Sequence, residues 1–243
     1  MKISIITATF NSSKTIEDCL NSVSEQTHPD VEHIVIDGGS KDGTIEIVRK
    51  YPKVKWISEK DNGLYDAMNK GIKMATGEVI GILNSDDFYS DILTLSKVVG
   101  IFNSNIIDAA YGDLEYISKS DKSNIVRRWK SPDWDLGINF KKWWLIPHPA
   151  LFVRKAVYSK YGGYDTNFKL TADYEYIIRV LRNENIRLFH IPHALVKMRT
   201  GGASHKNIFR ANYEFMNVNK KNNISFGFLL VVRKLFDKLI QMF

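Results

Sequence analysis

Four short apolar runs rich in β-branched residues alternate with three helix-like segments at the start of the chain, and this alternation limits the possible folds most strongly. Within the helix-like segments, apolar residues recur at helical spacing, as Ile16, Leu20 and Val23 do after a cap that Ser12 or Ser13 can supply. Because each helix returns the chain to start another strand in the same direction, we expect an α/β fold with a Rossmann-like, doubly wound, mostly parallel sheet. The apolar runs are residues 2–9, 31–37, 54–58 and 78–83, and the helix-like segments are 12–26, 44–51 and 61–75.

From residue 109 the pattern changes, and we expect a small antiparallel portion of the sheet. No repeat or low-complexity linker interrupts the chain, so one compact domain is expected. The predicted elements are strands at 109–117 and 123–130, a strand or helix start at 150–158, a helix at 172–183 and a hairpin at 186–199 around Pro192.

The composition is typical of a soluble globular protein, with 44% hydrophobic and 25% charged residues among 243. The single cysteine, Cys19, excludes an internal disulfide and fits a reducing compartment. We find no signal-peptide pattern at the start and no apolar stretch long enough to span a bilayer. These features predict a cytoplasmic protein.

The formal net charge of +7 favours an anionic partner, which leaves nucleic acid, a nucleotide and a membrane surface as alternatives. Residues 226–243 have the pattern of an amphipathic helix with a basic polar face. Such a helix can lie in a membrane interface, here the cytoplasmic face of the inner membrane. It can equally dock on the protein core or on a second subunit, giving a homodimer.

Polar residues follow all four apolar runs, and those after the last run include two adjacent aspartates, Asp86 and Asp87. Neighbouring carboxylates repel unless a cation or hydrogen-bond donors compensate them, although a simple polar loop also explains this stretch taken alone. Open parallel sheets bind ligands beyond the carboxyl ends of their strands. No phosphate-binding glycine motif is present, so a Mg²⁺ or Mn²⁺ ion at the two aspartates is the predicted means of holding a phosphate.

Five segments in series carry a family resemblance: SIITATFNSSKTIEDCLNSVSEQTH, IVIDGGSKDGT, KDNGLYDAMNKGI, ATGEVIGILNSDD and TADYEYIIRV. Together they resemble family 2 glycosyltransferases of the GT-A fold over about the first 200 residues. The resemblance implies an inverting, metal-dependent transfer of a sugar from a nucleotide diphosphate donor. It also implies a catalytic domain at 1–205, with a nucleotide-sugar half at 1–113 and an acceptor half at 114–205, followed by a helical segment at 206–243.

Matched position by position, the resemblance implies roles for individual residues. Asp173 matches the catalytic base, and Asp87 matches the ligand of the metal that bridges the diphosphate, with His205 as a second metal ligand. Asp86 would contact the ribose or the metal, and Asp37 would contact the uracil edge. The other implied donor-binding residues are Thr7, Ala8 and Phe10 around the nucleobase, with Asp66, Lys70, Asn84 and Arg199.

The chain departs from the family pattern at two positions. Ala172 stands where many relatives have a glutamate, so the role of base rests on Asp173 alone. Gly38 stands where many have a second aspartate, which leaves Asp37 as the sole carboxylate there. An aspartate near the start of a helix is also commonly a cap or a partner of the helix dipole, and this is the alternative for Asp173.

Two further segments are candidate binding regions. Trp143, Trp144 and His148 occur in a loop-like stretch, where ring faces suit sugar CH surfaces and a histidine can bond a hydroxyl or a phosphate. We expect His148 and one tryptophan to contact the acceptor; the alternative is core tryptophans and a satisfied polar histidine. Residues 197–205 resemble a loop that closes over the donor, although a surface hairpin end is equally consistent.

The predicted function is transfer of a hexose or N-acetylhexosamine from a UDP-sugar to a saccharide or polyprenyl-diphosphate-linked oligosaccharide, forming a β-glycosidic bond. The setting would be bacterial surface polysaccharide synthesis, such as O-antigen, lipopolysaccharide or capsule. A sugar nucleotidyltransferase is the first alternative, but it would be expected to have a glycine- and basic-rich loop after the first strand. A non-catalytic basic binding protein is the second, and nucleic acid is disfavoured because an acidic strand-end cluster repels phosphate unless metal is bound.

Overall fold

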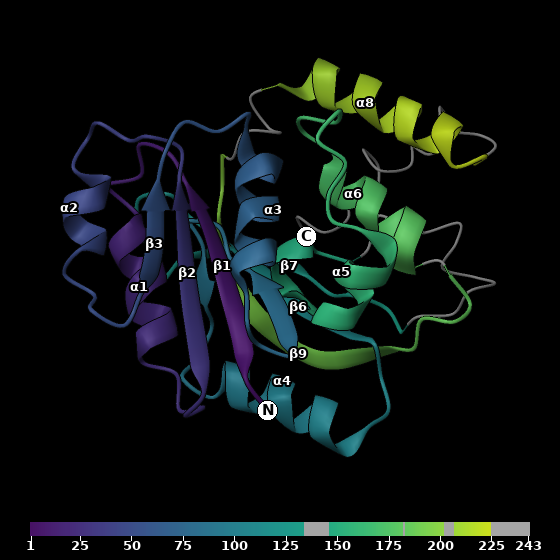
Figure 1. Cartoon of the computed structure of the whole chain (residues 1–243), viewed down its shortest axis with the longest axis horizontal. Helices are drawn as coiled ribbons and strands as arrows, with labels where there is room; N and C mark the ends of the chain where they lie inside the picture. The colour runs from purple at the N-terminus through teal and green to yellow at the C-terminus, as the bar shows by residue number, and fades with distance from the viewer. Residues whose placement is uncertain (134–145, 182, 202–206, 225–243) are drawn as a thin grey trace.

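The computed structural model describes residues 1–133, 146–181, 183–201 and 207–224, which are the coloured parts of the ribbon in Figure 1. The amphipathic helix predicted at 226–243 lies outside the described residues. Within the described residues, no helix is both long enough and apolar enough to cross a membrane.

The start of the chain forms the predicted parallel sheet. Its strands are β1 (Ile3–Thr9), β2 (Val31–Asp37), β3 (Lys55–Ser58) and β4 (Val79–Ile82), and the helices between them are α1 (Ile16–Ser24), α2 (Thr44–Val48) and α3 (Leu64–Met74). β1 lies at the centre and pairs in parallel with β2 on one side and β4 on the other, while β3 extends the sheet beyond β2. This part of the prediction is confirmed.

The later strands complete a mixed sheet. These strands are β5 (Phe88–Tyr89), β6 (Ala109–Ile117), β7 (Ile125–Trp129), β8 (Leu151–Arg154) and β9 (Leu188–Arg199). Their order in the described sheet is β3-β2-β1-β4-β8-β6-β9-β5, with β7 paired to β6. β8 runs antiparallel to both β4 and β6, and β7 runs antiparallel to β6, so the expected antiparallel portion is present.

The hairpin predicted at 186–199 is wrong, because this stretch forms the single strand β9. β9 pairs in parallel with β6, and the register shifts where Ile191 lies opposite Gly112 but Ala194 lies opposite Asp113. Pro192 has no N–H to donate to the ladder, so it is accommodated at this irregularity and does not need a reversing turn.

The predicted cap of α1 is also different. The helix begins after Thr15, and no side chain caps it. The Ser12 hydroxyl instead lies 2.9 Å from the Ser85 hydroxyl, while the Ser13 N–H donates to Asp42 at 3.0 Å. The Ser12 hydroxyl and the Ser13 N–H therefore connect the loop after β1 to the loops after β4 and β2.

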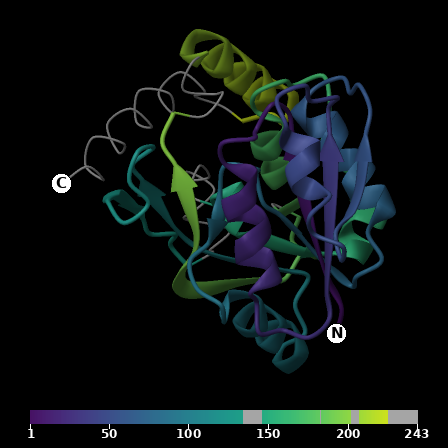
Figure 2. The same ribbon diagram turned by 90° about the vertical axis from the view of Figure 1, so that its left-hand side faces the viewer.

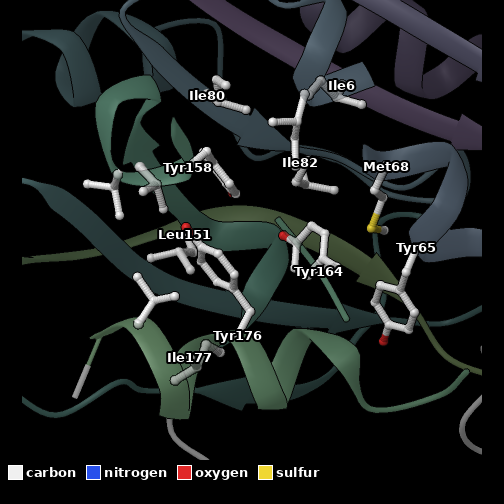
Figure 3. Close-up of a cluster of buried hydrophobic side chains, with 14 of the residues drawn as sticks. Ile6, Tyr65, Met68, Ile80, Ile82, Leu151, Tyr158, Tyr164, Tyr176 and Ile177 are labelled. Atoms are coloured by element: carbon white, nitrogen blue, oxygen red, sulfur yellow. The ribbon is translucent and has the colours of Figure 1, made fainter. Parts of the chain in front are cut away.

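Helices cover both faces of the sheet, as predicted. One face carries α3, α5 (Lys155–Tyr161) and α6 (Ala172–Tyr176), which continues as a π-helix over Ile177–Leu181. The other face carries α1, α2 and α4 (Thr94–Ser104). The rings of four tyrosines of the first core layer contact one another, namely Tyr65, Tyr158, Tyr164 and Tyr176. Figure 3 shows the Tyr65 ring at the margin of this cluster with the hydroxyl directed away from it.

The helix α8 (Ile208–Lys221) packs against α6 (Figure 1). The Phe215 ring stacks on Tyr174 with centroids 4.6 Å apart, and Glu214 accepts a hydrogen bond from the Leu170 N–H at 2.8 Å. In Figures 1 and 2 the N-terminus lies at one end of the molecule and α8 at the other, which is also the end toward which β1, β2 and β3 point. α8 therefore fixes the segment that leads into α6 on the side where the strand-end loops gather.

Candidate active site

The carboxyl ends of the parallel strands lie side by side and form one rim. The register pairs Thr9 with Asp37 and Asp37 with Ser58, so β1, β2 and β3 end together. The Ser12 hydroxyl contacts the Ser85 hydroxyl at 2.9 Å, which brings the loop after β4 to the same rim. The polar segments that follow the four strands are thus gathered at one edge of the sheet, where open α/β sheets bind their ligands.

Asp37 organises the loop that follows β2. Its carboxylate is buried, and Oδ2 accepts hydrogen bonds from the N–H groups of Gly39 and Ser40 and from the Ser58 hydroxyl at 3.1, 2.9 and 2.6 Å. Oδ1 accepts a further bond from the Ser40 hydroxyl. All four of these donors belong to the chain, so Asp37 holds the shape of the rim, and its contact with a nucleobase stays a prediction.

Asp61 lies beside Gly38 and was not singled out from the sequence. A side-chain carbon added to Gly38 would lie 2.6 Å from Asp61 Oδ2 and 3.3 Å from the Phe10 ring. The Asp61 carboxylate therefore occupies the space that a side chain at position 38 would need. The family's second aspartate is missing at position 38, and a search for acidic residues after the next strand would have found this neighbouring one.

The three residues predicted around the nucleobase do not share one environment. Phe10 is 62% exposed at the rim. Thr7 is fully buried, and its hydroxyl lies 3.0 Å from His33 Nε2, beneath α1. Ala8 is buried in the opposite core layer. Of these three, Phe10 is thus the residue whose side chain is open to a ligand.

Lys70 and Asp66 lie on α3 beside the loop that follows β3. Lys70 Nζ is 2.7 Å from Glu59 Oε1 and 3.8 Å from Asp66 Oδ2, and the hydrogen bond to Glu59 raises the lysine pKa. Asp66 also accepts the Asn62 N–H at 3.0 Å. The Lys70 ammonium group therefore lies next to the rim, although it is already paired with the carboxylates of Glu59 and Asp66.

The turn after β4 places two aspartates in a low-dielectric setting. Asp87 is fully buried, and its Oδ2 accepts a hydrogen bond from Asn84 Nδ2 at 2.9 Å. Burial, and then the neighbouring Asp86 charge, raise the pKa of Asp87 well above its ordinary value. Burial also raises the pKa of Asp86. Ionisation of both aspartates is therefore unfavourable unless a cation binds beside them.

The donor atoms at this turn suit a hard divalent cation. Asp87 Oδ1 and Asn84 Oδ1 are both buried, and neither has a hydrogen-bond partner among the residues that the structure describes. Such orphaned oxygens cost free energy, and oxygens are the ligands that Mg²⁺ and Mn²⁺ prefer. The described residues contain no group of three or more His, Cys, Asp or Glu side chains that could hold a metal, and the predicted ligand His205 lies outside them.

Arg199 supports this turn from within the protein. Its guanidinium is buried, donates to the backbone carbonyl of Asp86 at 2.5 Å, and forms an ion pair with Asp18 on α1. The same group lies 5.3 Å from the centroid of the Phe88 ring. The structure thus gives Arg199 internal partners, and its predicted contact with the donor stays a prediction.

Asp173 is held by two other elements. Asp173 Oδ1 accepts a hydrogen bond from the Tyr65 hydroxyl of α3 at 2.8 Å, and Oδ2 lies 3.0 Å from His148 Nδ1 of the short 3₁₀ helix η3 (His148–Ala150). Burial raises the pKa of Asp173, but the His148 charge and the two hydrogen bonds outweigh it and lower the pKa. The residue in the cap position of α6 is Thr171, so Asp173 is not the N-cap, but it lies in the first turn, where an acidic side chain also interacts favourably with the helix dipole.

His148 links the predicted base to the paired aspartates. A charge on His148 helps to lower the pKa of Asp173, and it offsets part of the rise that burial causes in the pKa of Asp86. Its Nε2 atom is buried and has no hydrogen-bond partner in the described part of the chain. The structure therefore brings His148 into contact with Asp173, two of the sequence-predicted residues, whereas Trp143 and Trp144 lie outside the described residues.

Comparison with solved structures shows the fold of the chain. The chain superposes on Staphylococcus aureus TarS, solved in complex with UDP-GlcNAc, with a TM-score of 0.70, 23% sequence identity and 85% of this chain covered. It also superposes on the mannosyltransferase PcManGT from Pyrobaculum calidifontis, solved with GDP-Man and Mn²⁺, with a TM-score of 0.68 and 20% identity over 90% of this chain. The chain spans 61% and 63% of those two chains. The fold is that of the GT-A glycosyltransferases.

The sequence comparisons identify the family. Residues 4–159 match the model of Glycosyl transferase family 2, to which this chain belongs. A PGL/p-HBAD biosynthesis glycosyltransferase of Mycobacterium bovis is 32% identical over 197 residues, covering 77% of this chain and 73% of the relative. The protein is therefore a glycosyltransferase, and the alternatives of a sugar nucleotidyltransferase and a non-catalytic binding protein are excluded.

Proposed function

We propose that this protein transfers a hexose or N-acetylhexosamine from a UDP-sugar, with inversion, to a saccharide or polyprenyl-diphosphate-linked oligosaccharide of a bacterial surface polysaccharide. The observation that carries the proposal is the turn after β4, where the buried Asp87 Oδ1 and Asn84 Oδ1 have no hydrogen-bond partner among the described residues, together with Asp173, which His148 and Tyr65 hold. A nucleotide sugar as donor is supported by the ligands named for the two structural relatives. The preference for UDP follows the TarS complex and the resemblance of the sequence.

The donor side combines a ring and several acceptor oxygens. The exposed Phe10 ring offers a face for a nucleobase, and the neighbouring Asp61 carboxylate can accept an N–H from the base edge. Asp37 keeps the loop between them in shape. Lys70 supplies positive charge beside this loop, where a diphosphate is attracted.

A Mg²⁺ or Mn²⁺ ion would be held by the Asp87 carboxylate, with Asn84 Oδ1 and Asp86 as further oxygen donors. When bound, such an ion stabilises the negative charge that develops on the departing diphosphate. Asn84 keeps the second oxygen of Asp87 fixed by its hydrogen bond. Arg199 fixes the backbone of Asp86, so the turn keeps its geometry while the charge changes.

The acceptor side lies around Asp173. A sugar hydroxyl is a weak nucleophile, and a positioned base that takes its proton in the transition state raises its reactivity. The Asp173 centre, with Tyr65 and His148 bound to it, provides that basic group. An acceptor that attacks from this side, opposite the leaving diphosphate, inverts the anomeric carbon, so an α-linked donor gives a β-glycoside.

The proposed membrane location is supported by α8. Phe209, Tyr213 and Met216 are 88%, 62% and 41% exposed, and their spacing places them on one side of the helix, in line with the exposed Lys220. An apolar stripe that ends in basic residues suits an anionic membrane surface on the cytoplasmic side. Such a location would bring the rim near a lipid-linked acceptor.

A donor screen tests the catalytic proposal. The protein is incubated with UDP- and GDP-linked hexoses and N-acetylhexosamines, with Mn²⁺ or with EDTA, and nucleotide release is measured. We expect release from a UDP-sugar that requires Mn²⁺. Release from a GDP-sugar alone would reject the UDP assignment, and equal release in EDTA would reject the metal. The anomeric configuration of the product, read by NMR, decides the question of inversion.

Vesicle flotation tests the membrane proposal. Wild-type protein should bind vesicles that contain phosphatidylglycerol more strongly than vesicles of phosphatidylcholine, and Phe209→Ser with Tyr213→Ser should release it. Ile106→Ser, which changes an exposed apolar residue elsewhere, serves as the matched control. Unchanged flotation of the double variant, or a dimer in solution that the double variant converts to monomer, would count against membrane binding through α8.

A further inference from the structure

The turn between β6 and β7, residues 118–124, lies at the same rim as the carboxyl ends of the parallel strands. β8 runs antiparallel to both β4 and β6, so β6 points in the same direction as β4 and ends at the rim. A contact agrees with this placement, because Lys122 Nζ in the turn is 2.7 Å from Asp18 Oδ1 in the first turn of α1. Asp18 also pairs with Arg199, which donates to the backbone carbonyl of Asp86. The β6–β7 turn is thus connected to the two aspartates that follow β4.

The order of the strands places this turn on the far side of the aspartates from the proposed nucleobase contacts. The sheet runs in the order β3-β2-β1-β4-β8-β6. Phe10 and Asp61 follow β1 and β3, Asp87 follows β4, and the turn 118–124 follows β6. A nucleotide that extends from Phe10 to Asp87 therefore directs its diphosphate toward the β6–β7 turn.

Side-chain contacts hold the two strands of this hairpin together. The Tyr116 and Trp129 rings stack with their centroids 6.3 Å apart, and the Arg127 guanidinium lies 3.8 Å from the Tyr116 centroid. Arg128 Nε is 3.0 Å from Glu115 Oε1 on the neighbouring strand. The charges of both arginines therefore have partners within the hairpin, which leaves its lysines as the groups that can serve a ligand.

The two lysines of the turn differ in their surroundings. Lys119 is exposed, and its ammonium group has no ion pair or hydrogen bond among the residues that the structure describes. Lys122 is also exposed, but it is paired with Asp18. Burial raises the pKa of Asp86, and the Lys119 charge offsets part of this rise, so these two groups are close enough to interact. Lys119 is thus a solvent-accessible charge beside the predicted metal site.

The leaving group of the proposed reaction needs positive charge beyond what the predicted metal site supplies. The carboxylates of Asp86 and Asp87 would neutralise much of the charge of a divalent ion held there, whereas the diphosphate gains negative charge as it departs. Lys70 and Arg199, the other cations predicted at the donor, already have carboxylate partners. A lysine without such a partner is suited to this task, because cations placed where charge develops stabilise the transition state.

We propose that the Lys119 ammonium group binds the donor diphosphate and stabilises the negative charge that develops on it during transfer. The proposal rests on the proposed function and adds a residue to its donor site. The bond between the anomeric carbon and the diphosphate oxygen breaks, and its electron pair leaves with the nucleoside diphosphate. The acceptor oxygen forms the new bond to the anomeric carbon, and its proton goes to the Asp173 centre. Lys119 stays protonated throughout and transfers no proton.

Lys119→Met removes the charge and keeps the side chain close to its original length. In calorimetry with Mn²⁺, we expect the affinity for UDP to fall about tenfold, because a charged hydrogen bond is lost, and the affinity for uridine to stay within about twofold. Lys119→Arg should keep most of the UDP affinity, since a guanidinium also binds phosphate. Lys122→Met, the matched control from the same turn, should change it less than about twofold. Equal losses in the two methionine variants, an equal loss for uridine, or a raised KM for the acceptor alone would overturn the proposal.

Chemical labelling tests the inference even if no UDP-sugar is turned over, in which case the donor assignment fails on its own. Lysines of the wild-type protein are acetylated with and without UDP, GDP or inorganic pyrophosphate, each with Mn²⁺, and the labelled sites are read by mass spectrometry. We expect pyrophosphate and the nucleotide that binds to protect Lys119, and the labelling of Lys122 to stay the same. Labelling of Lys119 that all three compounds leave unchanged would overturn the proposal.

Discussion

Asp87 is fully buried and Asp173 has a 24% exposed side chain, and the pKa values of these two aspartates are shifted in opposite directions. Burial and the adjacent Asp86 raise the pKa of Asp87, and its Oδ1 has no hydrogen-bond partner among the described residues. Burial acts on Asp173 too, but His148 and Tyr65 reverse its effect. The comparison teaches that the donor side is built to receive a positive charge from outside, whereas the acceptor side already contains its partners.

The two sides also differ in how they are assembled. Asp37 and Asp87 are held mainly by groups a few residues away, such as Gly39 and Asn84. Asp173 is held by Tyr65, which lies 108 positions earlier in the chain. The donor rim therefore takes much of its shape from local contacts, to which Ser12 and Arg199 add distant ones, while the acceptor centre depends on the packing of α3, η3 and α6.

The largest effect is expected for a substitution on the donor side of the site. Asp87→Asn should lower metal-dependent sugar transfer by about 1,000-fold or more, because a neutral amide cannot replace the charged ligand. The melting temperature in EDTA should stay the same or rise, since a buried carboxylate with a raised pKa costs folding energy when it is ionised at pH 7. Asp30→Asn, at an exposed position, is the control for both measurements. Undiminished transfer would remove the metal from this turn.

The next effect concerns the support of that turn. Arg199→Met leaves the Asp86 carbonyl without its donor and Asp18 without its ion pair, so unfolding in urea should require about 4 kcal/mol less free energy. Arg128→Met, which removes a largely exposed ion pair with Glu115, should cost less than about 1 kcal/mol. A variant at 199 with wild-type stability and a raised KM for the donor would instead assign Arg199 to the diphosphate.

A buried histidine beneath the donor rim predicts a dependence on pH. Burial lowers the pKa of His33 to about 4, below the value of about 6.5 expected in the unfolded chain. The unfolded state therefore gains the proton first, so stability is complete above about pH 6.5 and falls as the pH decreases toward 4. The loss should reach about 3 kcal/mol. His33→Gln should lack this part of the slope in urea titrations, and equal slopes would contradict the assignment.

The smallest effect is expected on kcat, for a substitution on the acceptor side of the site. Tyr65→Phe removes one of the two hydrogen bonds to Asp173 while keeping the ring in the core, so kcat should fall about tenfold at unchanged donor KM. Tyr164→Phe changes a neighbouring tyrosine of the same cluster, and its activity should stay within about twofold of the wild type. Equal losses in both variants would indicate a general effect on packing.

The sequence was informative where structure is local. Alternating apolar runs predicted β1 to β4, and acidic residues after them located the rim, because strand ends and turns depend on neighbouring residues. The hairpin at 186–199 was predicted wrongly because Pro192 is typical of a turn, and the long ladder with β6 that contains it comes from distant pairing. Asp61 and Tyr65 were missed as site residues for the same reason, since their roles depend on Gly38 and Asp173 in space.

The contacts of α8 determine the order in which the two sides of the site can fold during synthesis. Glu214 and Phe215 hold the segment around Leu170 and Tyr174, so the surroundings of Asp173 are finished by residues that the ribosome adds about forty positions later. A nascent chain can form the parallel strands and their rim early, but its acceptor centre has to wait for α8 to emerge. Premature termination before residue 207 would therefore yield a protein that still offers a donor rim while lacking the support of its reaction centre.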